Sequence, residues 1–184
     1  TIDVDMAYSY KAKGLYRNCG GFIRDLINGN FEDCGKRIRV LWFKEKDPYD
    51  SFDYILSTLT KYKLKTLFFI LFGQNDKYDK NISPYNRKFQ LLVKYLGDYA
   101  KIGIHPSYFC FDSPEEIPMQ VKLLSSTIHK AITRSRFHYL RFRLPKSYRT
   151  LIDNEITEDF SMGYADQVGF RASICTSFNF YDLE

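Results

Sequence analysis

Thr1-Ile2-Asp3-Val4-Asp5 opens the chain and reads as a short buried strand that ends in two carboxylates. Side chains alternate along a strand, so Asp3 and Asp5 point toward the same face. Two like charges on one face repel each other unless a cation lies between or beside them. A divalent metal held by one carboxylate, with the other acting as a base, resolves this repulsion. The alternative is a pair of turn-capping acids, or acids that pair with Lys11 and Lys13.

Two further strand-like runs carry polar residues at or near their ends, as the first run does. Residues 101–105 end in His105, and residues 137–144 carry His138 and Arg143. Ligands of α/β proteins gather at the carboxyl ends of parallel strands, so these runs predict one polar site on one rim of a sheet. Neutral imidazole is a good zinc ligand, although a lone histidine is commonly a packed core or surface residue.

The pattern of residues 137–144 does not decide which face of the predicted strand carries His138. Strict alternation places His138 with Phe142 and Leu144, and it places Arg141 and Arg143 on the opposite face. If the arginines face the site, His138 faces the helices unless a bulge intervenes. The remaining histidine, at position 129, is expected on a solvated face in the middle of a helix.

Strands and helices alternate along most of the chain. The spacing of apolar residues predicts helices at 15–28, from about residue 51 onward, and at 86–100, 113–133 and 146–154. Strands are expected at 1–5, 64–72, 101–105, 137–144, 156–160 and 168–172, and residues 38–43 are either a strand or a buried loop. This alternation indicates an α/β protein with a parallel sheet, either doubly wound or closed into a barrel. A complete (β/α)8 barrel needs about 250 residues, so a shortened barrel fits the length better.

Length and composition favour a single folded domain over residues 1–184. Hydrophobic residues make up 45% and aromatic residues 17%, which argues against disorder. The aromatic residues either fill the core or line a groove that stacks sugars or bases. The 27 basic and 22 acidic residues are spread along the chain, which does not favour a nucleic-acid partner and is compatible with a polar or anionic substrate.

Cysteine spacing and hydropathy give the expected compartment. The four cysteines form no C-x-x-C pair, so free thiols in a reducing cytoplasm are expected. No apolar run is long enough to span a bilayer. The chain opens directly on a core strand without a starting Met, so we expect it to be a piece of a longer protein.

Four short motifs occur in an order that resembles NodB-type polysaccharide deacetylases. They are T-I-D-V-D, G-I-H-P-S, R-F-R-L-P and E-D-F-S-M-G-Y, and they span nearly the whole chain. The resemblance is greatest to the divergent deacetylase-like proteins of bacterial surface-glycan pathways. It implies a distorted, incomplete (β/α) barrel that removes N- or O-acetyl groups from a carbohydrate. It also implies a divalent metal, with zinc expected and nickel, cobalt or iron as alternatives.

The resemblance assigns roles to particular residues. Asp3 matches the catalytic base, Asp5 the metal-binding aspartate, and His105 the first histidine of the H-S/T-x-x-H motif. The second histidine of that motif falls at Phe109, which cannot bind a metal. Either His138 supplies the missing ligand from a neighbouring strand, or the site is weak or inactive.

Further positions are assigned through the later motifs. Arg143 matches the arginine of R-x-P, which orients the base. The histidine that acts as general acid in the family has no match before the chain ends, so it lies beyond that end or His138 takes its task. Ser107, Tyr108 and Arg171 are the candidates for contacting the sugar, although Tyr108 could simply pack against its neighbours.

Two other functions fit parts of this pattern. Haloacid-dehalogenase-type phosphatases also carry D-x-D at the end of the first strand, with Mg²⁺ as the metal. They need a later strand that ends in an acidic pair, together with a lysine, whereas the later strands here end in His and Arg. A non-catalytic glycan-binding domain, which has lost the motif histidine at Phe109, is the second alternative.

Overall fold

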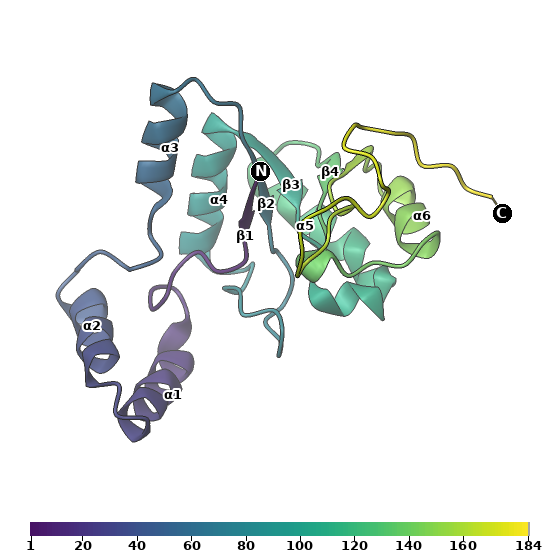
Figure 1. The fold of residues 1–184 in the computed structure, drawn as a ribbon. Coiled ribbons are helices and arrows are strands. Elements are labelled where there is room, and N and C mark those ends of the chain that lie inside the picture. The colour runs from purple at the N-terminus through teal and green to yellow at the C-terminus, as the bar shows by residue number, and fades with distance from the viewer. Residues whose placement is uncertain (184) are drawn as a thin grey trace.

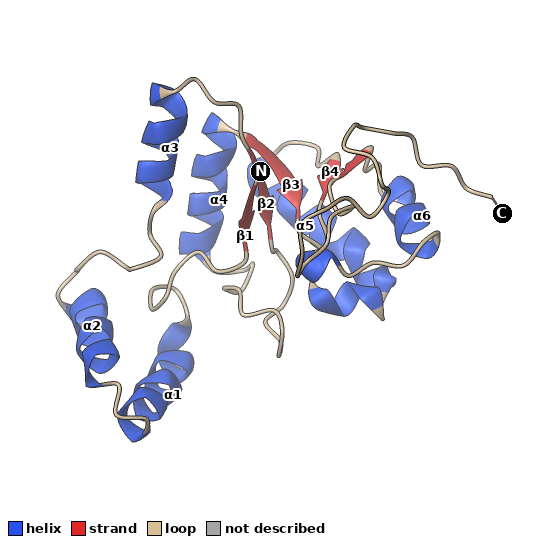
Figure 2. Ribbon diagram, viewed as in Figure 1, coloured by secondary structure: helices blue, strands red, loops and turns tan. Residues whose placement is uncertain are grey.

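The structure is a computed structural model that describes residues 1–183. Within these residues a five-stranded, fully parallel sheet has the same strand order as the sequence (Figures 1 and 2). The strands are β1 (Ile2–Val4), β2 (Leu67–Ile70), β3 (Lys101–Ile104), β4 (Arg134–Ser135) and β5 (Glu158–Asp159). The predicted α/β class with a parallel sheet is confirmed. The sheet stays open, with β1 and β5 at its two edges, so it does not close into a barrel.

Helices connect the strands, as parallel pairing requires. The α-helices of the described chain are α1 (Gly14–Ile27), α2 (Phe31–Trp42), α3 (Phe52–Lys61), α4 (Arg87–Tyr99), α5 (Ile117–Ile128) and α6 (Lys146–Asp153). Three short 3₁₀ turns are η1 (Tyr108–Phe111), η2 (Pro114–Glu116) and η3 (His138–Leu140). Helices α4 and α5 pack on each other and on β3, whereas α1 and α2 form a hairpin that projects away from the sheet (Figure 1). Among the helices of residues 1–183, none is both long and apolar enough to cross a bilayer.

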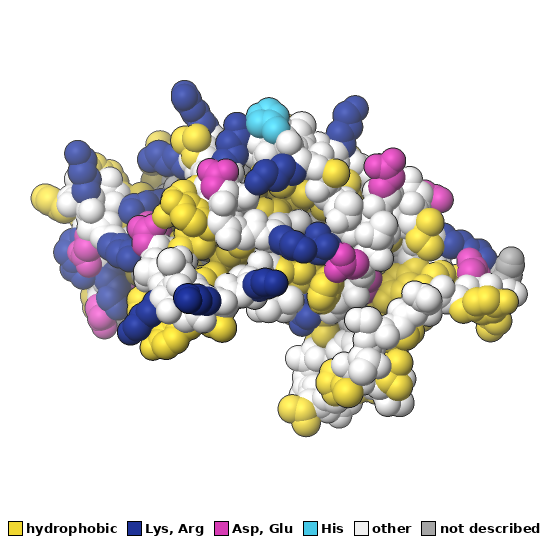
Figure 3. All heavy atoms as spheres, turned by 90° about the horizontal axis from the view of Figure 1, so that it is seen from above, with side chains coloured by type: hydrophobic (Ala, Val, Ile, Leu, Met, Phe, Trp, Pro, Cys, Tyr) yellow, Lys and Arg dark blue, Asp and Glu magenta, His cyan; other side chains and the backbone are white. Residues whose placement is uncertain are grey.

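The core is centred on β2, which is buried on both faces as its apolar run predicts. Phe68, Phe69 and Ile70 are fully buried, and α4 packs Phe89 and Leu96 into the same core. Burying both faces excludes water from the middle of the sheet, which leaves the strand ends as the places where polar side chains can gather. Figure 3 shows the edge of the sheet at which the strands begin. Basic side chains are spread among apolar ones on this surface.

The prediction of a strand at 137–144 is wrong. After β4 the chain turns through η3, where Tyr139 and Leu140 adopt left-handed backbone angles with φ of 55° and 50°. A strand cannot continue through left-handed residues. Phe137 and Phe142 are still buried, with their rings stacked at 5.8 Å, so a turn achieves the burial that alternation had suggested.

Three smaller predictions also differ from the structure. Residues 38–43 are neither a strand nor a buried loop, because they complete α2 and its C-cap. His129 ends α5 in a left-handed conformation with φ of 56° instead of lying in mid-helix. Residues 168–172 form a turn in which Phe170 makes one isolated bridge to Gly163.

Candidate metal centre

Three side chains from separate strand ends meet at the carboxyl edge of the sheet. Asp5 follows β1, His105 follows β3, and His138 begins the turn after β4. One ligand atom from each side chain lies within 4.8 Å of the other two. Nε2 of His105 is 3.2 Å from Oδ1 of Asp5, and Nε2 of His138 is 3.8 Å from Oδ2 of Asp5. The structure therefore brings together the three residues that the sequence proposed as metal ligands.

Both imidazole rings are held through Nδ1. Nδ1 of His105 contacts the carbonyl oxygen of Arg136, and Nδ1 of His138 is 2.8 Å from Oδ1 of Asp79. A carbonyl oxygen and a carboxylate oxygen accept hydrogen bonds, so Nδ1 must be the donor in each contact. In the neutral form of each histidine the ring proton is therefore on Nδ1. Nε2 then carries the lone pair in both rings, and both lone pairs face Asp5. Histidines that ligate metals are oriented by this same kind of contact.

The arrangement of charges favours a cation in this position. The two histidine side chains are buried, whereas about half of the Asp5 side chain is exposed. Burial acts to raise the pKa of the Asp5 carboxyl, but the hydrogen bond to His105 and the charges of His105, His138 and Arg136 outweigh it, so the pKa is lowered. The lowering by His105 and His138 belongs to their protonated forms, whose Nε2–H groups point at the Asp5 carboxylate. When the two rings are neutral, the Asp5 carboxylate faces two nitrogen lone pairs instead. Two imidazoles and one carboxylate, open to solvent on one side, match the donor set of catalytic zinc sites, and imidazole also suits nickel and iron.

Asp79 contacts the candidate metal centre through His138, and sequence reasoning missed it. It lies in the loop between β2 and α4 and is almost fully buried. Besides the contact with His138, its Oδ1 accepts a hydrogen bond of 2.9 Å from the backbone N–H of Tyr108. A signal was present in the sequence, because this polar loop follows a buried strand and therefore emerges at the carboxyl edge of the sheet.

Asp3 is held by Arg136. Nε of Arg136 is 3.0 Å from Oδ2 of Asp3, and its Nη1 donates to the carbonyl oxygen of Phe160 at 3.0 Å. Arg143, which the sequence assigned to this role, lies elsewhere, with its guanidinium carbon 4.7 Å from the centre of the Phe111 ring. The structure thus places Arg136, the residue directly after β4, where the sequence expected Arg143.

The three candidate sugar-binding residues lie in different surroundings. The hydroxyl of Ser107 accepts a hydrogen bond of 3.0 Å from Gln120. The ring of Tyr108 lies 4.3 Å from that of Tyr78, and both belong to an aromatic cluster with Tyr139 beside the metal centre. Arg171 is farther along the chain and donates to the carbonyl oxygen of Leu140, so it acts on the turn that follows His138.

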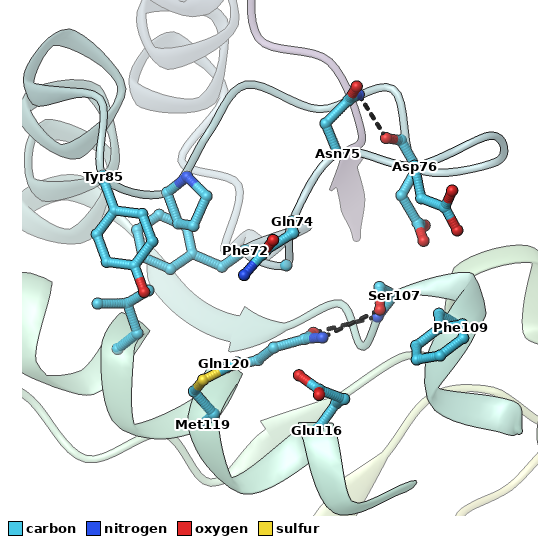
Figure 4. Close-up of a pocket in the computed structure, with 14 residues that line it drawn as sticks. Phe72, Gln74, Asn75, Asp76, Tyr85, Ser107, Phe109, Glu116, Met119 and Gln120 are labelled. Atoms are coloured by element: carbon cyan, nitrogen blue, oxygen red, sulfur yellow. Dashed lines mark hydrogen bonds between the residues drawn. The ribbon is translucent and has the colours of Figure 1, made fainter. Parts of the chain in front are cut away.

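A cavity of about 300 Å³ (Figure 4) is lined in part by Asp79, the partner of His138 in the candidate metal centre. It shares Asp79 and Ser107 with the surroundings of the two histidines. The other walls are the carboxylates, amides and aromatic rings of Asp76, Glu116, Gln74, Asn75, Gln120, Phe72, Tyr85 and Phe109. Phe109, the residue at the position of the motif histidine, is about half exposed at this cavity. Its ring thus forms part of a cavity wall.

The sheet and this site define an α/β protein with a candidate metal centre at the carboxyl ends of its strands. No family model matches the chain, and no curated protein matches it either. Among solved structures, it is similar to the polysaccharide deacetylase Bc1974 from Bacillus cereus, with a TM-score of 0.44 and 17% sequence identity. The match covers 58% of this chain and 52% of that one, so it spans about half of the solved protein.

Proposed function

We propose that this chain is a metal-dependent carbohydrate deacetylase, built on a deacetylase-type, incomplete (β/α) barrel, that removes acetyl groups from an amino sugar or glycan. The observation that carries the proposal is the orientation of two imidazoles, whose Nδ1 atoms are tied to oxygens and whose Nε2 atoms face Asp5. The order of the sequence motifs supports the same function.

Asp5, His105 and His138 are the residues that would hold the ion, with zinc as the first choice and nickel, cobalt or iron as alternatives. When bound, such an ion polarises the carbonyl group of the substrate and lowers the pKa of water. Asp79 and the carbonyl group of Arg136 keep both rings turned toward it. This support reduces the reorganisation that the protein needs when the ion binds.

Asp3 is the general base in this proposal. Its carboxylate lies on the same strand as Asp5 and is fixed by Arg136, so it can accept a proton from the attacking water. Because His138 serves as a ligand in this proposal, it is not the general acid. The protonated Asp3 can return its proton to the departing nitrogen or oxygen of the sugar, so one carboxylate can perform both proton transfers.

The surroundings of the centre suit a carbohydrate. Glu116 and Gln74 in the cavity supply hydrogen-bonding groups for hydroxyls, and Phe109 and Tyr85 supply apolar rings that can pack against the C–H face of a sugar. The tyrosine cluster at residues 78, 108 and 139 offers a second aromatic surface beside His138.

The test combines elemental analysis with acetate release. We expect purified protein to hold one equivalent of zinc, nickel, cobalt or iron and to release acetate from acetylated chito-oligosaccharides or acetylated xylan. Asp5→Ala should lose the metal and the activity, whereas the matched variant Asp3→Asn should keep the metal and lose the activity. Metal-free protein that releases no acetate after reconstitution overturns the proposal. Stoichiometric metal with tight glycan binding and no acetate release assigns the chain to the non-catalytic alternative.

A further inference from the structure

The α1–α2 hairpin turns its apolar side chains toward solvent. On α1, Tyr16 is 93% and Ile27 78% exposed, and on α2 Trp42 is 69% exposed. The spacing of apolar residues places Phe22, Ile23, Leu26 and Ile27 on one face of α1, and Ile23, Leu26 and Ile27 of that face are exposed. Helices of globular proteins normally direct such a stripe toward the core.

The buried side chains of the hairpin helices are Asn18 and Asp25 on α1 and Cys34, Arg37 and Val40 on α2, so three of the five are polar. Arg37 of α2 donates to Asp25 at 2.6 Å and to Asn18 at 3.1 Å, and all three side chains are buried between the helices. Gly21 lies against the guanidinium, where an added Cβ would be 2.7 Å from Nη2. Charge and hydrogen bonds therefore make up much of the contact between the two helices, and the apolar stripes lie on their exposed faces.

Each helix carries one outward stripe with the same spacing. On α1 the stripe is Tyr16, Gly20, Ile23 and Ile27, and on α2 it is Phe31, Gly35, Ile38 and Trp42. Steps of four, three and four residues keep side chains on one face of a helix. Large apolar residues at three of the four positions give each helix a continuous hydrophobic strip, and Phe43 extends the strip of α2.

The charge of the hairpin complements an anionic surface. Residues 11–46 contain nine lysines and arginines and four acidic residues, an excess of five positive charges that equals the formal net charge of the whole chain. Arg24 lies beside the stripe of α1 with its side chain 73% exposed, and Lys44 and Lys46 follow the end of α2. Arg17 is not part of this basic surface, because it donates to the carbonyl oxygens of Lys80 and Asn81. Exposed aromatic and aliphatic residues with flanking basic residues are the pattern of helices that lie in the lipid headgroup region.

We propose that the α1–α2 hairpin docks this protein on the surface of an anionic lipid bilayer. The apolar stripes enter the boundary between headgroups and acyl chains, and the basic side chains contact lipid phosphates and carboxylates. The hairpin emerges from the carboxyl edge of the sheet, beyond β1, so docking brings that edge toward the lipid (Figure 1). This proposal is independent of the chemistry at Asp5, His105 and His138.

Vesicle flotation tests the proposal with the full chain. We expect binding to vesicles made of equal parts phosphatidylglycerol and phosphatidylcholine, much weaker binding to pure phosphatidylcholine, and a decrease as salt is raised. Ile23→Glu and Trp42→Glu each place a charge in a stripe and should lower the partition coefficient about tenfold or more. The matched control is Leu91→Glu, because Leu91 is 55% exposed on α4, outside the hairpin, and should leave binding unchanged.

Three outcomes would overturn the proposal. The first is no binding of the wild-type chain to anionic vesicles. The second is an equal loss of binding in Leu91→Glu, which would show that the effect is one of net charge. The third is a wild-type protein that does not bind vesicles and forms a dimer in sedimentation equilibrium, which Ile23→Glu dissociates. The stripes would then belong to a contact between two copies.

Discussion

Arg136 contacts Asp3 across 133 positions of sequence, with 3.0 Å between Nε and Oδ2. The contact joins the side chain that follows β4 to a carboxylate on β1 and spans the carboxyl edge of the sheet. The guanidinium of Arg136 also donates a hydrogen bond to the carbonyl oxygen of Phe160, so Arg136 is itself fixed in place. An arginine that is held on two sides keeps the Asp3 carboxylate in one orientation.

Replacing this arginine is therefore expected to affect catalysis more than metal binding. In Arg136→Gln the carboxylate of Asp3 loses its ion pair, and we expect kcat for acetate release to fall about 10²-fold, the range of a misplaced general base. Metal content, measured by elemental analysis, should remain that of the wild type. The control is Arg143→Gln, whose guanidinium lies over Phe111 and which should change kcat by less than about twofold. A larger loss in Arg143→Gln than in Arg136→Gln would contradict this assignment.

Asp79→Asn should weaken the metal centre without unfolding it. The amide keeps an acceptor for Nδ1 of His138 but loses the negative charge that makes the ring a stronger ligand. Changes to such partners typically cost 10- to 100-fold in metal affinity, and we expect a loss in that range in a chelator competition assay. Asp76→Asn, an exposed acid in the same loop, is the control. Equal affinities in both variants would remove Asp79 from the centre.

Arg37→Met should destabilise the hairpin strongly. It leaves the buried Asp25 with only the longer contact of 3.4 Å to the exposed Arg24, and breaking a buried ion pair typically costs up to about 3–5 kcal/mol. The free energy of opening of α1 and α2, measured by native-state hydrogen exchange, should fall by about that amount. The matched change Arg39→Met removes an exposed pair with Glu45 and should cost less than about 1 kcal/mol. Similar losses in the two variants would argue against the buried network as the origin of hairpin stability.

The same network gives a pH dependence of defined sign. The hydrogen bond to Arg37 lowers the pKa of Asp25 below its ordinary value of 3.8. A lowered pKa contributes stability that is complete above the ordinary value and is lost as the pH falls toward the lowered one. Hydrogen exchange or circular dichroism should therefore show the hairpin of the wild type losing stability below about pH 4. In Arg37→Met this loss should be smaller, and an unchanged acid dependence would contradict the assignment to Asp25.

The strand ends could be predicted because local patterns determine them. Residues 1–5 and 101–105 are short apolar runs that end in Asp5 and His105, and a parallel sheet brings such ends to one edge. The Arg136–Asp3 contact could not be predicted in this way. The fourth strand lies at Arg134–Ser135, upstream of the predicted range 137–144, so an arginine that seemed to precede that strand instead follows it.

The hairpin shows a second limit of sequence patterns. Periodicity identifies α1 as an amphipathic helix, but it does not tell which of its faces is turned inward. The answer depends on Arg37, which lies on another helix and pairs with Asp25 and Asn18. Which face of α1 contacts α2 is decided by the tertiary structure, and it cannot be read from the spacing of residues within α1.

Asp79 is shared by the cavity and the candidate metal centre, because its carboxylate both lines the cavity and holds the ring of His138. A molecule that polarises this carboxylate from the cavity side changes the electron density available at Nε2. Thermodynamic linkage then requires reciprocity: if occupancy of the cavity alters the dissociation constant of the ion by some factor, the ion alters retention of the occupant by the same factor. Titrations of either component, performed with and without the other, should therefore form a closed cycle.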